Sequence, residues 1–444
     1  MKTHRNRFKR VATVTAVVVL LLLVAVYCYF SFSKYNASKD RIHADAELII
    51  KVDTDRLYST LAMDYFSNPS YYQNKSIESI ESGLKIPAQI FVYTVKSKSD
   101  QTYFCTLPVA DTVLLKSFIK EKLGITAVKN MGQYITGSSS NGRLSIAFNT
   151  HMFVAGYSLN GEKVENVIAD LLNKRNLLPN NDQLLIKLKG LKAHLAYVFK
   201  DCYGTGDFKD GQLHLEGSFS SEHFDVKGKT FSHRTFDKDA IIKMWFNVTP
   251  SLNKSYAGFK VKSYDVYPDS LLRYCNGYFD IEMGKTVHQV DTIITYEYND
   301  DFEKEEIVTP RNVTVPGINS VMASHAKGLI DYLSKSNIIV SGQVNKELFP
   351  LYRLYAKSNE TTVMLSTDRN AVISASRENT PYFFYLGIDF EQLKEQAQFP
   401  LLEKYIKPLS RLVIKANPES SHKNHFEVDL DFKRKDINAL GQLP

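Results

Sequence analysis

The sequence predicts an α+β protein, with an N-terminal transmembrane helix followed by a duplicated ectodomain of mainly antiparallel sheets covered by helices. Three observations predict this fold class: a long apolar run near the N-terminus, hairpin signals alternating with amphipathic helix signals, and two kinds of segment that recur in both halves of the body. The chain has 444 residues, 44% of them hydrophobic. We therefore expect two domains with full hydrophobic cores.

Residues 11–32 form the expected transmembrane anchor, because they contain no charged residue, no proline and no glycine. A helix of this length is sufficient to cross a hydrocarbon core of about 30 Å. Residues 1–41 carry eight basic side chains and one acidic side chain, which together account for the whole formal net charge of +7. The positive-inside rule then keeps the basic tail, residues 1–10, in the cytoplasm and places the body outside it.

Two alternatives to an uncleaved anchor are less well supported by the sequence. A cleaved signal peptide has a shorter apolar run and a small-x-small cleavage site, whereas here Tyr35 puts a bulky ring at that position. Lipid modification of Cys28 needs a small residue before it, and Tyr27 is there. The body that follows is neutral, so the sequence predicts no nucleic-acid partner and a lipid-bilayer partner through residues 11–32.

After a polar linker at residues 33–41, one type of unit occurs three times: an apolar strand that ends at Asp or Asn and runs into an amphipathic helix. The three strand ends are Asp53, Asn247 and Asp389. Each side chain is placed to accept hydrogen bonds from the free amides of a first helical turn. We therefore expect all three residues to be helix N-caps.

A second type of segment, an amphipathic hairpin, is expected at residues 211–231 and at residues 411–433. Each hairpin closes a half of the body that began with the strand and capped helix. This repetition predicts a first α+β domain at residues 42–231 and a second at residues 232–444. Further hairpins are expected at 90–107, 144–157 and 361–375, and helices at 111–123, 162–175, 320–334 and 345–355.

No motif in the sequence specifies a reaction, since phosphate-binding glycine loops, GxSxG and HExxH are all missing. The strongest polar pattern is Glu427, Asp429 and Asp431, which alternate along a strand and therefore share one face. Three carboxylates in a row are metal-site candidates for a hard cation such as calcium, or an acid and base pair. The favoured alternative is a solvent-facing side of a sheet with basic neighbours. No cofactor is predicted.

Three cysteines lie in the body: Cys105, Cys202 and Cys275. Their odd number leaves at least one thiol unpaired in a monomer. Cys202 and Cys275 are able to pair in an oxidising compartment only if the fold brings them together, which the sequence does not decide.

Three segments resemble a known group of proteins: residues 46–53 with Leu57 behind them, residues 295–302, and residues 426–443. Together they resemble exported, membrane-attached proteins of uncharacterised function from Bacteroidetes-type Gram-negative bacteria. The resemblance implies a bacterial envelope protein that faces the periplasm. It implies no catalytic residues.

The sequence therefore favours a membrane-anchored, periplasm-facing binding or assembly module of the bacterial envelope, with an envelope protein as its partner. Its expected localisation is the inner membrane, crossed once. The neutral body, the internal duplication and the lack of a catalytic motif favour a protein that is not an enzyme. The alternative is an envelope hydrolase whose Ser, His and Asp come from distant parts of the chain, because such triads are recognised by geometry.

Overall fold

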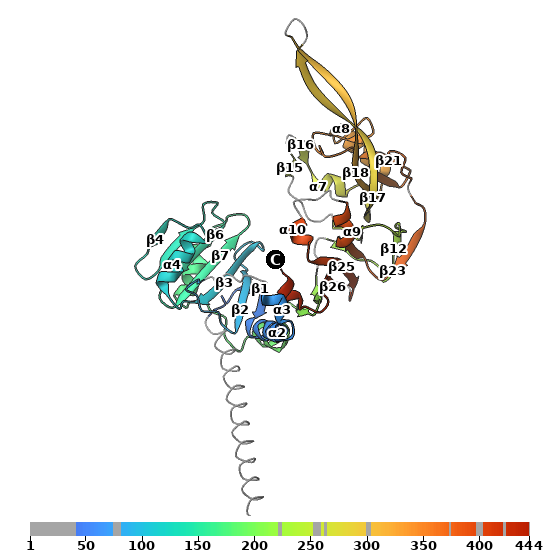
Figure 1. Cartoon of the computed structure of the whole chain (residues 1–444). Helices are drawn as coiled ribbons and strands as arrows, with labels where there is room; N and C mark the ends of the chain where they lie inside the picture. Colours follow the sequence, from blue (N-terminus) through green and yellow to red (C-terminus); the bar gives the residue numbers. More distant parts are fainter. Residues whose placement is uncertain are drawn as a thin grey trace, which may run out of the picture. The chain divides into compact units, whose positions relative to one another are not determined.

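The computed structural model describes residues 41–73, 81–220, 224–251, 259–261, 264–298, 303–372, 374–396, 403–420 and 423–443. The chain forms two compact units, unit 1 ending at Asp207 and unit 2 beginning at Phe208. The division falls inside strand β9 (Cys202–Lys209), so the boundary expected near residue 232 lies within unit 2. Each unit consists mainly of antiparallel strands with a few helices (Figure 1).

The strands described in unit 1 form an antiparallel sheet in the order β9–β8–β1–β2–β3–β7–β6–β5–β4. Strand β1 lies inside this sheet because both of its edges are paired, one with β2 and one with β8. Strand β4 lies at one end. The bounds are β1 (Ala46–Asp53), β2 (Gln89–Val95), β3 (Thr102–Pro108), β4 (Val128–Asn130), β5 (Ile135–Ser138), β6 (Leu144–Phe148), β7 (Met152–Ser158) and β8 (Leu195–Phe199).

Helices pack on both faces of the unit 1 sheet, and alternate residues of β6 show the two cores. Ala147 lies in a cluster with Leu171 of α5, whereas Phe148 lies in a cluster with Leu115 and Ile119 of α4. Both faces are therefore apolar, as expected for a sheet covered on both sides. The helices of unit 1 are α2 (Thr54–Ser67), α3 (Pro69–Gln73), α4 (Thr112–Glu121), α5 (Glu165–Leu172) and α6 (Gln183–Gly190).

Unit 2 contains a longer antiparallel sheet, in the order β10–β26–β25–β24–β13–β17–β18–β22–β21–β20–β19. Its strands are β10 (Gln212–Phe219), β13 (Ile242–Asn247), β17 (Cys275–Tyr298), β18 (Lys304–Ser324), β19 (Ile339–Val340), β20 (Gln343–Val344), β21 (Tyr355–Ser358), β22 (Thr362–Ser366), β24 (Phe384–Asp389), β25 (Leu409–Pro418) and β26 (Asn424–Phe432). Three short pairs lie beside it: β11 (Phe224–Asp225) with β14 (Thr249–Pro250), β12 (Phe231–Arg234) with β23 (Arg377–Thr380), and β15 (Phe259–Val261) with β16 (Tyr264–Val266).

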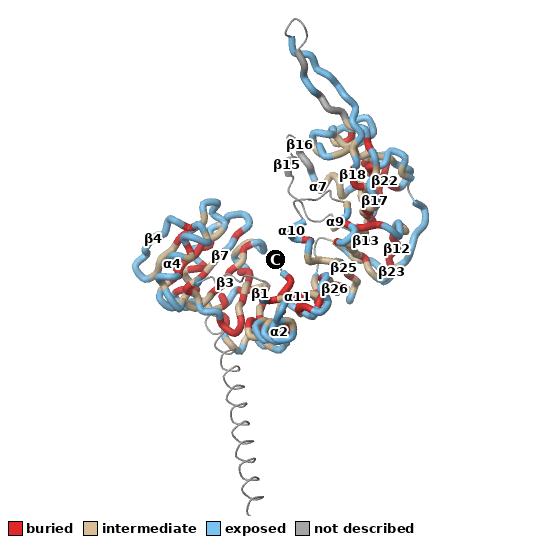
Figure 2. The backbone as a smooth tube through the Cα atoms, in the orientation of Figure 1, coloured by how far each residue is buried: buried red, intermediate tan, exposed pale blue. Residues whose placement is uncertain are grey.

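Helices cover only parts of the unit 2 sheet. Phe390 and Leu393 of α9 pack with Ile406 of α10 over the central strands, and Leu329 of α8 packs on Val363 of β22. Figure 2 shows the buried residues gathered along the central strands of this unit. The helices of unit 2 are α7 (Pro268–Leu272), α8 (Ala326–Lys335), α9 (Phe390–Glu395), α10 (Glu403–Ile406) and α11 (Ala439–Gln442).

Two of the three predicted caps are confirmed. The carboxylate of Asp53 accepts a hydrogen bond from the amide of Arg56 in α2, and that of Asp389 accepts from two first-turn amides of α9. Asn247 is not a cap, because the chain continues from it towards β14, and its side-chain amide donates to the carbonyl of Ser232 at 3.0 Å.

Predicted elements are confirmed where partners are close in sequence. The hairpins at 90–107, 144–157 and 411–433 form, as do the helices within 111–123 and 162–175. The hairpin at 211–231 is wrong, because β10 pairs with β26, whereas β11, the strand that follows β10, pairs with β14. The helix expected at 320–334 forms from Ala326 onwards as part of α8, after the end of strand β18. The segment 345–355 contains no helix, and β22 pairs with β18 and β21 rather than forming a hairpin over 361–375.

The predicted fold class is wrong in one major element. Within the described part of the chain no helix is long and apolar enough to cross a membrane. The longest described helix, α2, has 14 residues, whereas a bilayer needs about 20. The expected anchor at residues 11–32 lies outside the described residues. The predictions of a lipid-bilayer partner and of a single-pass inner-membrane localisation rested on that anchor, and the structure does not support them.

The ectodomain part of the prediction needs a second correction. Strands dominate both units, and the sheet of unit 2 extends well beyond the helices that pack on it. The mixture of helices and strands fits an α+β composition, but the architecture is that of large antiparallel sheets with local helical cover.

Candidate functional site

The three carboxylates identified in the sequence lie on one face of β26, as their alternation predicts. Asp429 accepts a hydrogen bond from Nδ1 of His214 on β10, at 2.7 Å. Asp431 accepts from Nε2 of Gln212 on the same strand, at 3.2 Å. Each of the two carboxylates therefore has its own donor on the neighbouring strand.

Glu427, the third carboxylate, lies opposite Glu216 of β10 and opposite Lys415 of β25. Its Oε1 is 3.5 Å from Nε2 of His425. Within the described ranges, no group of three or more His, Cys, Asp or Glu side chains is arranged to hold a metal ion. The contacts of this row are those of a polar sheet surface balanced by neighbouring strands.

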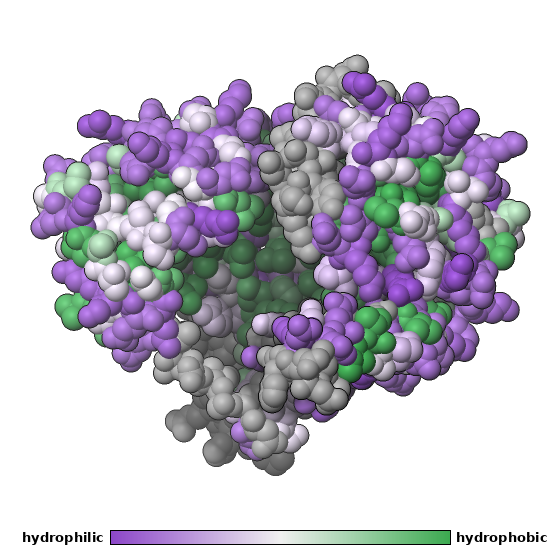
Figure 3. Space-filling model, turned by 90° about the horizontal axis from the view of Figure 1, so that it is seen from above, coloured by the Kyte–Doolittle hydropathy of each residue, from purple (hydrophilic) through white to green (hydrophobic). Residues whose placement is uncertain are grey.

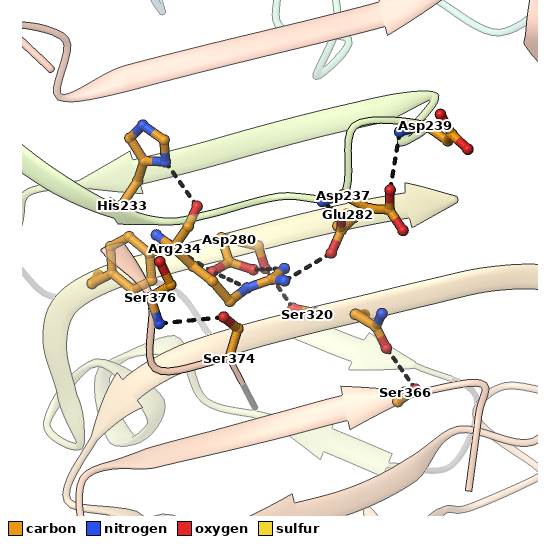
Figure 4. A network of polar contacts seen from close by, with 12 residues as sticks. His233, Arg234, Asp237, Asp239, Asp280, Glu282, Ser320, Ser366, Ser374 and Ser376 are labelled. Carbon is orange, nitrogen blue, oxygen red and sulfur yellow. Dashed lines mark hydrogen bonds and ion pairs between the residues drawn. The ribbon is translucent and has the colours of Figure 1, made fainter. Parts of the chain in front are cut away.

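A buried ionic cluster lies in unit 2, around Arg234 of β12 (Figure 4). Its guanidinium contacts both carboxylate oxygens of Asp280, at 3.1 and 2.9 Å, and donates to Glu282 at 2.7 Å. Both acids are on β17 and both are buried. The hydroxyl of Tyr278 donates to Asp280 at 2.7 Å and accepts from the backbone amide of Arg234 at 2.8 Å.

Burial by itself would lower the pKa of Arg234, but hydrogen bonds and charges from Asp280 and Glu282 reverse this and hold its pKa above the usual value. Burial, reinforced by the charge of Asp280, raises the pKa of Tyr278. Arg234 therefore stays charged and Tyr278 stays protonated. The cluster joins β12 to β17, and its members satisfy one another.

An aromatic stack lies beside this cluster. The rings of His233 and Trp245 are 3.9 Å apart and inclined by 12°, and the ring of Tyr385 lies 4.3 Å from Trp245 on β13. The indole N–H of Trp245 donates to the carbonyl oxygen of Tyr382 at 3.1 Å. The stack fixes β12 on the sheet, because it links β12, β13 and β24 through one continuous set of rings.

A hydroxyl, an imidazole and a carboxylate meet in unit 1. Nδ1 of His194 is 2.7 Å from Oδ1 of Asp207, and its Nε2 is 2.8 Å from the hydroxyl of Thr60 on α2. Because a carboxylate only accepts, Nδ1 carries a proton, and in the neutral imidazole Nε2 then accepts from the hydroxyl. This is the donor order of a Ser-His-Asp relay, with threonine in the first place. The hydrolase alternative stays a prediction, and the contact also holds α2 to the sheet.

The three cysteines in the described residues are free thiols. Cys202 and Cys275 are therefore not paired with each other. Burial raises the pKa of Cys105 to about 11, an effect that the nearby charge of Arg41 only partly offsets. The high pKa keeps this thiol neutral at physiological pH, so it is a weak nucleophile.

We expect the rate at which iodoacetamide alkylates Cys105 to rise with pH with a midpoint near 11, instead of the ordinary 9.0. A higher pKa means less thiolate at any given pH, and the thiolate is the reactive form. The measurement is the pH dependence of alkylation, followed for the Cys105 peptide by mass spectrometry. The control is the same peptide in urea-unfolded protein. Equal midpoints for the folded and unfolded chains would contradict this interpretation.

The ribbon of β17 and β18 runs out beyond the rest of unit 2 (Figure 1). Strand β17 pairs with β13 only as far as Met283, and β18 pairs with β22 only from Asn319 onwards. Between these points and the tip, the two strands pair only with each other. The side chain of Gln289 ties the base of the ribbon to the body by hydrogen bonds to Arg353 and Thr367.

We call the outer part of this ribbon, residues 292–298 and 304–310, the arm. Its seven cross-strand pairs extend roughly 20 Å. Tyr296 is 55% exposed and Val308 is 57% exposed. Both lie at even-numbered positions, which the register places on one face of the ribbon. Figure 2 colours the described residues of the arm as exposed.

Apolar side chains are also exposed on α2, where Met63 is 65% and Phe66 is 80% exposed, while the faces of both units seen in Figure 3 are mostly hydrophilic. The arm differs because its apolar side chains are carried on a two-stranded ribbon, whose outer edges have no strand partner among the described residues. The Val, Thr and Ile residues within 286–298 are typical of a strand, but nothing in the sequence indicates that this strand leaves the sheet.

No family model matches the sequence, and no curated protein is similar to it. Solved structures of TP0453 are similar to part of the chain. Crystal form IV matches 44% of this chain and 90% of that chain, at 9% identity and a TM-score of 0.27. Crystal form I matches 41% and 77%, at 4% identity and a TM-score of 0.26. A likeness of this size carries no argument about function.

Proposed function

We propose that the protein is a non-catalytic assembly module that binds a partner protein through the arm. The observation that carries the proposal is the exposed two-stranded ribbon, with Tyr296 and Val308 on one face. An isolated two-stranded hairpin is only marginally stable in water, and an exposed strand edge tends to pair with another chain. A binding role accounts for a segment that adds nothing to the core of its own unit.

The arm has two means of binding. Its edges offer backbone N–H and C=O groups for an added strand, and its even-numbered face offers the apolar side chains of Tyr296 and Val308, which lie beside Lys304 and Glu306. Burying an exposed valine or tyrosine contributes about 1–2 kcal/mol, so a small number of such contacts is enough for a specific, moderate affinity. The anchored base, through Gln289, holds the arm in a defined direction from the body.

The proposal is tested by photo-crosslinking in the native cell. A benzophenone amino acid is placed at Tyr296 in the arm, or at Tyr405 of α10 as a matched control. Tyr405 is an aromatic residue of the same unit with 59% exposure. We expect one discrete protein adduct from position 296 and none of that mass from position 405, because only the arm is part of the interface.

A second variant tests whether the apolar face is responsible. Val308→Asp in the chain that carries the crosslinker at position 296 places a charge on the same face, and we expect it to remove the adduct. The same adducts from positions 296 and 405, or no adduct from position 296, would contradict the proposed function.

A further inference from the structure

Strand β4 of unit 1 is an edge strand with one free side. Its residues Val128, Lys129 and Asn130 pair with β5, and among the described residues with no other strand. All three residues are exposed. An open edge of this kind presents alternate backbone N–H and C=O groups, which is the hydrogen-bonding pattern that an extended peptide matches. Figure 1 shows β4 at the end of the unit 1 sheet.

A cavity lies on each face of the sheet beside this edge. The larger has a volume of about 440 Å³ and is lined by Lys129 of β4 and Thr136 of β5, which are opposite each other in the register. The smaller has a volume of about 250 Å³ and is lined by Asn130 and Ile135, the next opposite pair. Successive residues of a strand point to opposite faces, so the two cavities flank the same edge.

The cavities exist because the helices do not reach the edge strands. Helix α5 packs on β6 and β7, and it contributes Ile168 to the wall of the larger cavity. Helix α4 contributes Thr112 and Lys116 to the smaller one. The ring of Tyr134, just before β5, lines both cavities and separates them.

The smaller cavity has the chemistry of a carboxylate site. Its lining includes the cation Lys116 and no acidic residue. The Oδ1 of Asn130 accepts from the amide of Gly132 at 2.9 Å, and the Oδ1 of Asn149 accepts from the amide of His151 at 2.8 Å. These bonds orient both side chains so that their N–H₂ groups are the groups left to donate. An ammonium and two amide donors favour an anion.

The larger cavity suits an apolar side chain. Its walls include Met131, Tyr134 and Ile168. The hydroxyls on its floor are already hydrogen-bonded: Ser138 to Ser145 at 3.2 Å, and Thr136 to a backbone carbonyl. Lys129 and Glu165 also line this cavity, and its volume of about 440 Å³ is ample for an aromatic or branched side chain packed against the apolar wall.

We propose that β4 binds an extended acidic peptide as an added strand. A bulky apolar side chain of the peptide occupies the larger cavity, and the carboxylate of the adjacent residue occupies the smaller one beside Lys116. Neighbouring residues of a strand face opposite sides of the sheet, so the apolar residue and the acidic residue of the peptide have to be adjacent in its sequence. This site uses none of the residues of the arm, so it goes beyond the proposed function and is independent of it.

Two labelled hexapeptides of the same composition test the site on the full-length protein by fluorescence anisotropy. In Thr-Thr-Phe-Glu-Thr-Thr the Phe and Glu side chains face opposite cavities, whereas in Thr-Phe-Thr-Glu-Thr-Thr they face the same one. We expect the first peptide to bind at least tenfold more tightly. Equal affinities, or no binding of either peptide, would overturn the proposal.

Substitutions in the protein assign the binding to the two cavities. Lys116→Ala is expected to weaken binding of the first peptide at least tenfold, because it removes the positive charge beside the peptide carboxylate. Its matched control is Lys120→Ala, an exposed lysine of the same helix that does not line the cavity. Ser138→Phe, at an exposed position of the larger cavity, is expected to block the apolar side chain. Equal effects of the two lysine variants would overturn the assignment.

Discussion

Arg234→Met is expected to lower the free energy of unfolding of unit 2 by about 3–5 kcal/mol. The substitution keeps the volume of the side chain but leaves the carboxylates of Asp280 and Glu282 buried without their cation. The chain has one tryptophan, Trp245, and it lies in the aromatic stack beside this cluster. Its fluorescence during urea unfolding therefore measures the stability of unit 2.

Two controls separate the loss of a buried charge from the loss of any ion pair. Lys285→Met removes the exposed partner of Asp239, a pair that is also 2.7 Å long, and should leave the unfolding midpoint unchanged because exposed pairs are screened by water. Asp280→Asn together with Glu282→Gln, introduced into the Arg234→Met chain, should restore part of the lost stability, because both buried charges are removed. If Arg234→Met lowered the free energy of unfolding by no more than Lys285→Met does, the expected effect of the buried charges would be contradicted.

Trp245→Ala is expected to destabilise unit 2 by about 3–5 kcal/mol. The indole packs between His233 and Tyr385, and its removal leaves a cavity that the flat neighbouring rings cannot fill. Calorimetry measures the change, since this variant has no tryptophan to report on unfolding. Trp245→Phe is the matched comparison, because it keeps a ring in the stack and loses only the hydrogen bond to Tyr382.

We expect Trp245→Phe to lower the free energy of unfolding by less than half as much as Trp245→Ala does. The difference between the two variants measures the stacking and volume of the ring, while the cost of Trp245→Phe measures mainly the lost hydrogen bond and the smaller ring area. Equal costs would mean that the stack contributes little and that the hydrogen bond alone matters.

The sequence predicts a local feature well where a single residue and its near neighbours in the chain are enough to form it. Asp53 and Asp389 become caps because a carboxylate next to a free first turn needs no distant partner. Asn247 has the same short-range signal, but its side chain is held by Ser232 and the chain continues as strand. The carboxylates of β26 share a face as expected, since a strand has a period of two.

Features that depend on distant partners could not be predicted. Lys51 shares the buried face of β1 with Ile49, and its ammonium donates to the carbonyl of Leu188 in α6 at 3.1 Å, a partner that the sequence does not reveal. Arg234 is a charged residue close to the expected domain boundary, yet it is buried because the two carboxylates that pair with it come from β17. A charged residue in the sequence predicts an exposed side chain only when no oppositely charged partner from a distant part of the chain lies beside it.

The hydrogen-bonded group of Thr60, His194 and Asp207 and the two cavities beside β4 could not be predicted for the same reason. His194 meets Thr60 from a position 134 residues away in the chain, and the edge at β4 has its cavities because two helices are short. No spacing rule connects such residues. The arm was missed for a different reason, since its strand pattern is visible but its length beyond the sheet is set by where β13 and β22 stop pairing.

The pairing of β10 with β26 determines when each unit is able to fold during synthesis. Strand β10 begins unit 2, yet its partner β26 is among the last residues to leave the ribosome, so unit 2 completes its sheet only as translation ends. The unit 1 sheet completes earlier, because β1 pairs with β2 and β8, and β8 pairs with β9, which ends at Lys209. We infer that the first unit folds while the second is still being made. A nascent chain stalled after residue 400 should therefore contain a protease-resistant unit 1 and a protease-sensitive unit 2.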